Sequence, residues 1–477
     1  MNGEKKMVFS SVVFLFYFLP CVLLVYYIAG KKYRNTALLV FSLGFYYWGG
    51  PKFIVVMLYY ILVNYFMGNL MSRFINNNTR KKTVLIVALI MDFGGLIYFK
   101  YTNFIVLNIN KLMFTDISVK NIVLPLGISF ITFQAASYIV DVYRNDAKVQ
   151  KNFINLALYL AFFPHLIAGP IVRYQTVADQ IESRTENIDD FAYGIERFIF
   201  GLAKKVILAN QIGYLADQVF TTDMNTMTMS LAWLGAIAYT LQIYFDFSAY
   251  SDMAIGLARM FGIKFHENFN YPYIAQSVSD FWRRWHMSLT TWFRDYVYIP
   301  LGGSRKSAII TIRNVFIVWF FTGFWHGASW NFIAWGLYFF VIVTLEKNIS
   351  KRIKFKIWRP IKHAYTLFFV TIGWVIFRLT SIRAIYHYVK VMFGLENWNV
   401  HNSFAFYYLG ENWIMLLLCI FFSMPVYSFI KNKYTNSNMA VQKGVLIFSP
   451  VLLMFLLLFA VMFLINSTFN PFIYFRF

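Results

Sequence analysis

The chain has 477 residues, of which 59% are hydrophobic, 21% are aromatic and only 13% are charged. A soluble domain of ordinary composition carries about 25% charged residues. The low charged fraction of this chain therefore excludes an ordinary soluble domain. The net charge of +22 does not indicate nucleic-acid binding, because the basic residues cluster in short loops at the ends of apolar runs. We therefore expect an all-α polytopic membrane protein whose positive charge faces anionic lipid.

Apolar runs long enough to approach or cross a bilayer recur along the whole chain. The run at 191–215 contains Lys204 and Lys205, so we expect it to lie in the membrane interface. No linker separates the runs, which favours one membrane domain over 1–477 with about 10–12 transmembrane helices plus re-entrant or interfacial helices. The runs lie at 8–29, 36–48, 53–72, 83–99, 121–140, 152–168, 191–215, 229–260, 315–345, 363–379, 413–430 and 445–466.

Two carboxylates lie inside the apolar run at 229–260. Asp246 has Tyr250 four residues later, and Asp252 has Ser248 four residues earlier, so each acid is predicted to have a hydroxyl partner on its own helix face. Buried acids at such depth often line a substrate path, although hydrogen bonding between helices is an equally good interpretation.

The segment 281–298 has the spacing of a short amphipathic helix that ends before Pro300. It is too short to span the membrane, so we expect it, with His286, to lie at an interface or to dip into the protein. Arg283 and Arg284 lie on its polar face and are candidates to bind phosphate groups. Ordinary cytoplasmic positive charge explains them equally well.

His326 lies within the long apolar run at 315–345. An ionisable side chain near the middle of a hydrocarbon layer usually faces a wet cavity or the protein interior, so His326 is a candidate for chemistry rather than a structural hydrogen-bond donor. Gly323 and Gly327 would let another helix approach closely. Basic residues flank the run on both sides, so we expect it to be broken or re-entrant between these glycines.

Several common enzyme signatures are absent from the sequence. The chain has no G-x-S-x-G elbow, no H-E-x-x-H pair and no Walker loop. Cys21 and Cys419 both lie in apolar runs, so neither a disulfide framework nor a thiolate metal site is expected. No nucleophile stands beside a base, which favours direct transfer between two substrates over a covalent enzyme intermediate.

Segments spread over most of the chain resemble the membrane-bound O-acyltransferase family, in its alginate O-acetylation branch. The resemblance is carried by LPLGISFITFQAASYIVDVYR, FFPHLIAGPIVR, FWRRWHMSLTTWFRDYVYIPLGG, GFWHGASWNFIAWG and the terminal NPFIYFRF.

This resemblance implies acyl transfer to a hydroxyl group, in helices arranged around a central transmembrane tunnel. His326 stands at the position of the family's most characteristic histidine, and His286 matches a second polar position. We expect the two to be catalytic and to approach the tunnel from opposite sides. Further substrate contacts are expected from Trp282, Trp285, Trp325 and Asn331, beside the arginines and acids named above.

The resemblance also implies acetyl-CoA as a donor substrate, with no permanently bound cofactor and no metal. The expected partners are an extracytoplasmic acetyltransferase, a polysaccharide acceptor and membrane lipids, and the expected location is the bacterial cell membrane. Two alternatives stay open: D-alanyl transfer to teichoic acid from a carrier-protein thioester, and a polysaccharide or lipid transporter whose histidines relay protons.

Overall fold

The computed structural model describes residues 7–120, 122–167, 169–352, 357–396, 400, 402–466, 470 and 473. Helices make up 77% of the structure, and these described residues contain no strand. The predicted all-α class is therefore confirmed.

The chain forms two compact units. Unit 1 comprises Met1–Phe198 and Tyr250–His266, and unit 2 comprises Ile199–Ala249 and Glu267–Phe477. The helices α9 (Ile188–Ala203) and α11 (Met229–Met260) contribute to both units. One domain over 1–477 stays a prediction.

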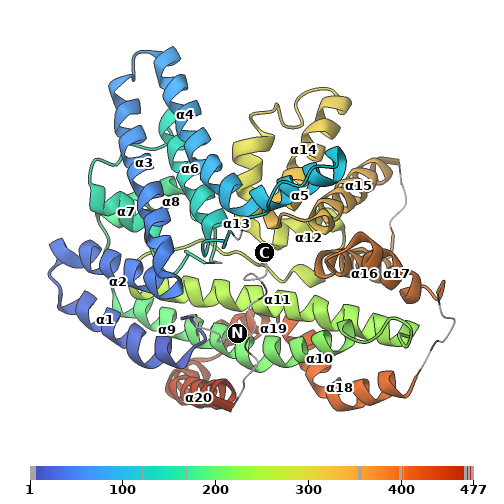
Figure 1. The fold of residues 1–477 in the computed structure, drawn as a ribbon. Helices are drawn as coiled ribbons and strands as arrows, with labels where there is room; N and C mark the ends of the chain where they lie inside the picture. The colour runs from blue at the N-terminus through green and yellow to red at the C-terminus, as the bar shows by residue number, and fades with distance from the viewer. Residues whose placement is uncertain are drawn as a thin grey trace. The chain divides into compact units, whose positions relative to one another are not determined.

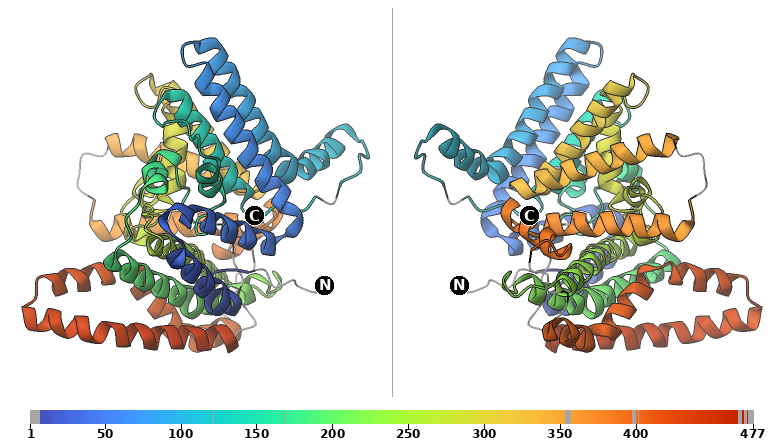
Figure 2. Two further views of the ribbon diagram at one scale, coloured as in Figure 1. Left: turned by 90° about the vertical axis from the view of Figure 1, so that its left-hand side faces the viewer. Right: turned by 90° about the vertical axis from the view of Figure 1, so that its right-hand side faces the viewer.

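In unit 1 the helices α3, α4 and α6 pack against one another, and α2 packs against α7. Figure 2 shows α3 and α4 as a long blue pair that lies side by side in both views. The hydroxyl group of Tyr60 in α3 donates a hydrogen bond to the backbone oxygen of Asp92 in α4 and lies 2.8 Å from the Thr132 hydroxyl in α6. The helices of this unit before α9 are α1 (Leu19–Ile28), α2 (Arg34–Gly49), α3 (Ile54–Arg73), α4 (Asn78–Leu96), α5 (Thr102–Met113), α6 (Ile128–Arg144), α7 (Phe153–Ala161) and α8 (Tyr174–Glu182).

Unit 2 is built around the antiparallel pair α14 and α15, which lie side by side in Figure 1. The short helix α12 packs against both α15 and α16. The helices of this unit are α10 (Asn210–Phe220), α12 (Val278–Arg284), α13 (Met287–Phe293), α14 (Ala308–His326), α15 (Trp330–Arg352), α16 (Arg359–Arg378), α17 (Ile382–Met392), α18 (Ser403–Ser423), α19 (Val426–Thr435) and α20 (Met439–Asn466).

The long apolar run at 315–345 is two helices, since α14 ends at His326 and α15 begins at Trp330. Gly323 makes the close packing of this hairpin possible: a Cβ atom there would lie 2.3 Å from the backbone oxygen of Phe332. The predicted break near the glycines is confirmed, and it explains why both flanks of the run are basic. His326 is the last residue of α14, and its depth in the membrane stays a prediction.

Seven helical segments among the described residues are long and apolar enough to cross a membrane, so the chain is a multi-pass membrane protein. This number is below the expected 10–12 because several expected runs form shorter helices; α7, for example, has 9 residues. A further, shorter apolar segment covers Phe14–Ile28. The seven are Pro51–Arg73, Asn78–Met113, Ala308–His326, Trp330–Ile349, Arg359–Arg378, Ser403–Ser423 and Val441–Asn466.

Candidate active site

The helix expected over 281–298 is interrupted at His286. The side chain of Ser277 caps α12 by accepting a hydrogen bond of 2.9 Å from the backbone N–H of Asp280. At His286 the backbone has φ 44° and ψ 53°, a left-handed conformation that stops α12 and turns the chain into α13. A π-helical segment, Arg294–Tyr298, then completes the expected stretch.

The His286 side chain is buried, with 1% of its surface exposed, and the position of its segment relative to a membrane stays a prediction. Its Nδ1 atom lies 3.2 Å from Oδ1 of Asn268, whereas its Nε2 atom is buried and makes no hydrogen bond. The Phe247 ring stands perpendicular to the imidazole, with 4.7 Å between the ring centroids. Burial lowers the pKa of His286 from 6.5 to about 3, which keeps the imidazole neutral at neutral pH.

His326 is also buried, with 6% of its surface exposed. Its imidazole meets the rings of Trp335 in α15 and Phe377 in α16 nearly at right angles, each at a centroid distance of 5.1 Å. The α14–α15 hairpin brings Trp335 to this position, since only a short turn separates the two helices.

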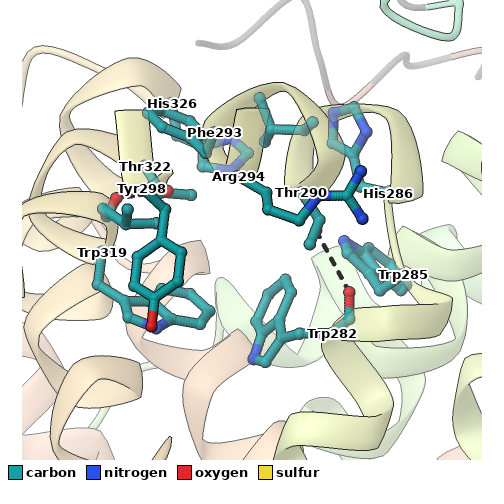
Figure 3. A pocket seen from close by; sticks show the side chains of 12 residues that line it. Trp282, Trp285, His286, Thr290, Phe293, Arg294, Tyr298, Trp319, Thr322 and His326 are labelled. Atoms are coloured by element: carbon teal, nitrogen blue, oxygen red, sulfur yellow. Dashed lines mark hydrogen bonds between the residues drawn. The ribbon is translucent and has the colours of Figure 1, made fainter. Parts of the chain in front are cut away.

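The two histidines line one cavity of about 180 Å³ in unit 2 (Figure 3). Five of its twelve lining residues are Trp, Phe or Tyr, and the two histidines, two threonines and one arginine add polar groups. The lining residues are Trp282, Trp285, His286, Leu289, Thr290, Phe293, Arg294, Tyr298, Val318, Trp319, Thr322 and His326. A small apolar space with a few convergent polar groups is typical of a ligand site.

The predicted tryptophans gather at this cavity. Trp282 and Trp285 line it directly. The ring of Trp325 packs against both imidazoles, with its centroid 6.0 Å from that of His286 and 5.0 Å from that of His326. Their joint position is consistent with substrate contacts, which stay a prediction.

Asn331 is buried and is not among the residues that line the cavity. Its amide nitrogen donates a hydrogen bond of 3.3 Å to the backbone oxygen of Phe377, the residue whose ring packs against His326. In this structure Asn331 therefore supports the wall behind His326.

The arginine that lines the cavity is Arg294, which the π-helical segment positions beside Thr290 in Figure 3. Arg283 and Arg284 do not line it. They form ion pairs with Asp280, at 3.5 Å and 3.1 Å, and 72% of the Arg283 side chain is exposed. Phosphate binding by Arg283 and Arg284 stays a prediction.

The acids of α11 are not among the residues that line the cavity, and they pair with cations rather than with the expected hydroxyl groups. In unit 2, Asp246 accepts a hydrogen bond of 2.6 Å from the buried Nζ of Lys205 and one of 2.8 Å from the backbone N–H of Ile473. An acid buried beside Lys205 thus neutralises its charge, and the expected position of this run in the interface stays a prediction. The Ser248 hydroxyl is buried without a hydrogen bond.

In unit 1, Asp252 pairs with Arg197, whose Nη2 lies 2.6 Å from Oδ1. Tyr250 is buried, and its ring stacks on that of Phe9 at 4.5 Å. These residues support packing within unit 1, and no contact with a substrate follows from their positions.

Sequence reasoning missed Asn268, the polar residue closest to His286. It lies 18 residues before the histidine, in a segment with no helical or strand pattern. No spacing rule connects the two, because the left-handed turn at His286 creates the contact. Among the described residues no group of three His, Cys, Asp or Glu side chains could hold a metal ion.

The comparisons with known proteins all indicate the same family. Residues 145–388 match the family model described as membrane-bound O-acyltransferase. The chain is 42% identical to a probable alginate O-acetylase AlgI of Pseudomonas aeruginosa over 398 residues, which are 83% of this chain and 76% of that protein.

Two further relatives have other named activities. The chain is 33% identical to a peptidoglycan O-acetyltransferase of Helicobacter pylori, over 82% of this chain and 80% of that protein. It is 33% identical to a teichoic acid D-alanyltransferase of Bacillus subtilis, over 54% of this chain and 69% of that protein.

Proposed function

Because the chain belongs to the membrane-bound O-acyltransferase family and is an O-acyltransferase, we propose that it transfers an acetyl group from acetyl-CoA to a hydroxyl acceptor. The acetyl group then serves the O-acetylation of a polysaccharide outside the cytoplasm. The names of two relatives, an alginate O-acetylase and a peptidoglycan O-acetyltransferase, support this choice.

The observation that carries the proposal is that His286 and His326 line the same cavity. A thioester is already activated, so the enzyme must mainly position donor and acceptor and remove the proton of the acceptor hydroxyl. Two buried imidazoles at one small, aromatic cavity suit that task.

His326 is the proposed general base. Aromatic rings surround its imidazole, and a base within hydrogen-bond reach of the hydroxyl group contributes about 10²–10⁴-fold to a rate. His286 is proposed to hold a polar group of one substrate in place, and the Trp325 ring, which packs against both imidazoles, supports the two side chains.

Cationic side chains at the mouth of the site are proposed to bind the phosphates of the donor. Arg294 lines the cavity, and Arg283 and Arg284 lie on the same stretch of chain. If the phosphates bind outside the apolar layer, only the acetyl group has to cross it, which avoids the cost of desolvating a highly charged coenzyme. Acetyl-CoA is thus a substrate, and no resident cofactor or metal is proposed.

The chain is proposed to act in the bacterial cell membrane together with lipids, a polysaccharide acceptor and an extracytoplasmic partner acetyltransferase. In this arrangement the immediate acceptor is a hydroxyl group of the partner or of the polymer. The second candidate is D-alanyl transfer from a carrier-protein thioester. The similarity to a teichoic acid D-alanyltransferase supports it, but this similarity covers only 54% of the chain.

The purified full-length protein tests this choice. With acetyl-CoA and a hydroxyl acceptor we expect release of free CoA thiol, and we expect no release with His326→Ala. Faster turnover of a D-alanyl carrier-protein thioester than of acetyl-CoA would favour the second candidate. Proton-coupled movement of a lipid-linked saccharide across proteoliposomes, without use of either thioester, would instead identify a transporter.

A further inference from the structure

Asn268, which is completely buried, contributes several hydrogen bonds to the turn at His286. The backbone oxygen of Asn268 accepts a hydrogen bond of 2.9 Å from the N–H of Met287. Its side-chain oxygen, Oδ1, accepts one of 3.2 Å from the N–H of Ser288. Asn268 thereby binds the two residues that directly follow the left-handed histidine.

The contact with Ser288 also fixes which way the amide of Asn268 faces. A backbone N–H can only donate a hydrogen bond, so the Asn268 atom opposite it must be the oxygen and not the NH₂ group. The Ser288 hydroxyl, 2.9 Å from the same oxygen, donates to it as well. The backbone N–H sets the orientation of this amide, and the hydroxyl group, which can donate or accept, is compatible with it.

The same oxygen then fixes the proton of the imidazole. Nδ1 of His286 lies 3.2 Å from Oδ1 of Asn268. Two bare acceptors would repel at this distance, so Nδ1 must carry the hydrogen and donate it. A neutral imidazole has one N–H, which leaves Nε2 with a free lone pair.

We propose that Asn268 is a positioning residue that holds His286 in the Nδ1–H tautomer, so that Nε2 accepts a hydrogen bond from an O–H or N–H group of a substrate in the cavity. The inference rests on the proposed function and defines the role of His286 in it. An Nε2 atom without a proton cannot polarise a thioester carbonyl, which needs a hydrogen-bond donor. His286 therefore orients a substrate and His326 remains the general base.

The tautomer can be observed without any activity. In the purified full-length protein labelled with ¹⁵N-histidine, NMR should show a protonated Nδ1 and an unprotonated Nε2 for His286, assigned by the loss of these signals in His286→Asn. A protonated Nε2 in the unsubstituted protein would overturn the proposal. This result stands apart from the proposed function, which fails instead if acetyl-CoA is not used.

Substitution of Asn268 tests the link to activity. Asn268→Leu removes the acceptor for Nδ1–H, and we expect at least an about tenfold loss of kcat, since an altered tautomer of a site histidine costs up to about 10⁴-fold in a serine protease. Asn270→Leu is the control, because the side chain of Asn270 is exposed, whereas that of Asn268 is buried against His286. Equal activity of both leucine variants and the unsubstituted protein would contradict the proposal.

The variant Asn268→Asp separates positioning from simple packing. A carboxylate keeps the oxygen acceptors for Ser288 and for Nδ1–H, so the tautomer and the rate at high pH should be retained. Its negative charge raises the pKa of the imidazole, so the rate should fall on acidification at a higher pH than in the unsubstituted protein. If Asn268→Leu fails to fold, the pH profile of Asn268→Asp and the NMR signals of His286 still test the proposal. An unchanged pH profile together with an Nε2–H signal would refute the assignment of the tautomer.

Discussion

His286 and His326 line the same cavity although they belong to different helical segments. One follows α12 at a left-handed turn, and the other ends α14 at the tip of a hairpin. Neither side chain has more than 6% of its surface exposed. The hairpin and the turn are therefore the two structural features on which activity should depend.

Replacing the proposed base should abolish transfer. We expect His326→Ala to lower the rate of acetyl transfer by about 10²-fold or more, the usual contribution of a general base, while membrane insertion and thermal stability change little. His266→Ala is the control, because His266 is exposed and belongs to unit 1. Near-normal transfer by His326→Ala would contradict the assignment, and loss of the folded protein would assign His326 a structural role.

The hairpin should not tolerate a methyl group at its contact. In Gly323→Ala the new Cβ would meet the Phe332 carbonyl oxygen at 2.3 Å, so the helices must separate and His326 must shift. We expect a lower melting temperature and a loss of activity. Gly410→Ala in α18 is the matched control, since nothing lies within 4 Å of its Cβ position, and helix propensity predicts a gain of up to about 1 kcal/mol. Equal melting temperatures of the two variants would refute this account of the hairpin.

Much of this site follows from the sequence, for reasons that particular residues make clear. The apolar runs predicted the class of fold, and basic residues on both sides of one run predicted its break at Gly323–Gly327. The position of an ionisable side chain inside a long apolar run also marked His326 as a candidate. By contrast, the burial of His286 and its contact with Asn268 depend on a left-handed turn at a non-glycine residue, which no periodicity indicates. The buried pair of Lys205 and Asp246 was missed because a lysine in an apolar run resembles an interfacial residue until its partner is located.

The buried ion pair of unit 2 should matter more for stability than an exposed one. Lys205→Met leaves Asp246 as a buried charge without its cation, and breaking a buried pair costs about 3–5 kcal/mol. Arg283→Met breaks the exposed pair with Asp280, which is worth at most about 1 kcal/mol. Thermal unfolding in detergent should separate the two variants clearly; similar melting temperatures would show that Asp246 does not depend on Lys205.

The cavity arginine should control the affinity for the donor. We expect Arg294→Ala to raise the KM for acetyl-CoA more than Arg283→Ala does, because Arg294 lines the cavity whereas Arg283 is mostly exposed. The difference should shrink as salt is added, since exposed charges are screened within about 10 Å at 0.1 M salt. A larger effect of Arg283→Ala would move the phosphate site to the polar face of α12.

Stability should fall in acid partly because of His286. Its pKa is about 3 in the folded protein and 6.5 ordinarily, so between these values the unfolded chain takes up a proton that the folded chain does not. Unfolding is then favoured as the pH falls from about 6.5 toward about 3. The other titratable groups that line its cavity are Arg294, Tyr298 and His326. Melting temperatures between pH 7 and pH 4 should fall less steeply for His286→Asn; an unchanged slope would show that His286 is not neutral and buried.

Transfer across a membrane is the central claim, and proteoliposomes test it most directly. The full-length protein is inserted with the partner acetyltransferase enclosed in the lumen, and acetyl-CoA labelled in its acetyl group is added outside only. The account predicts labelled acetyl on the enclosed acceptor, no CoA in the lumen and no labelling with His326→Ala. Labelling confined to the side that holds acetyl-CoA, or entry of intact acetyl-CoA into the lumen, would contradict it.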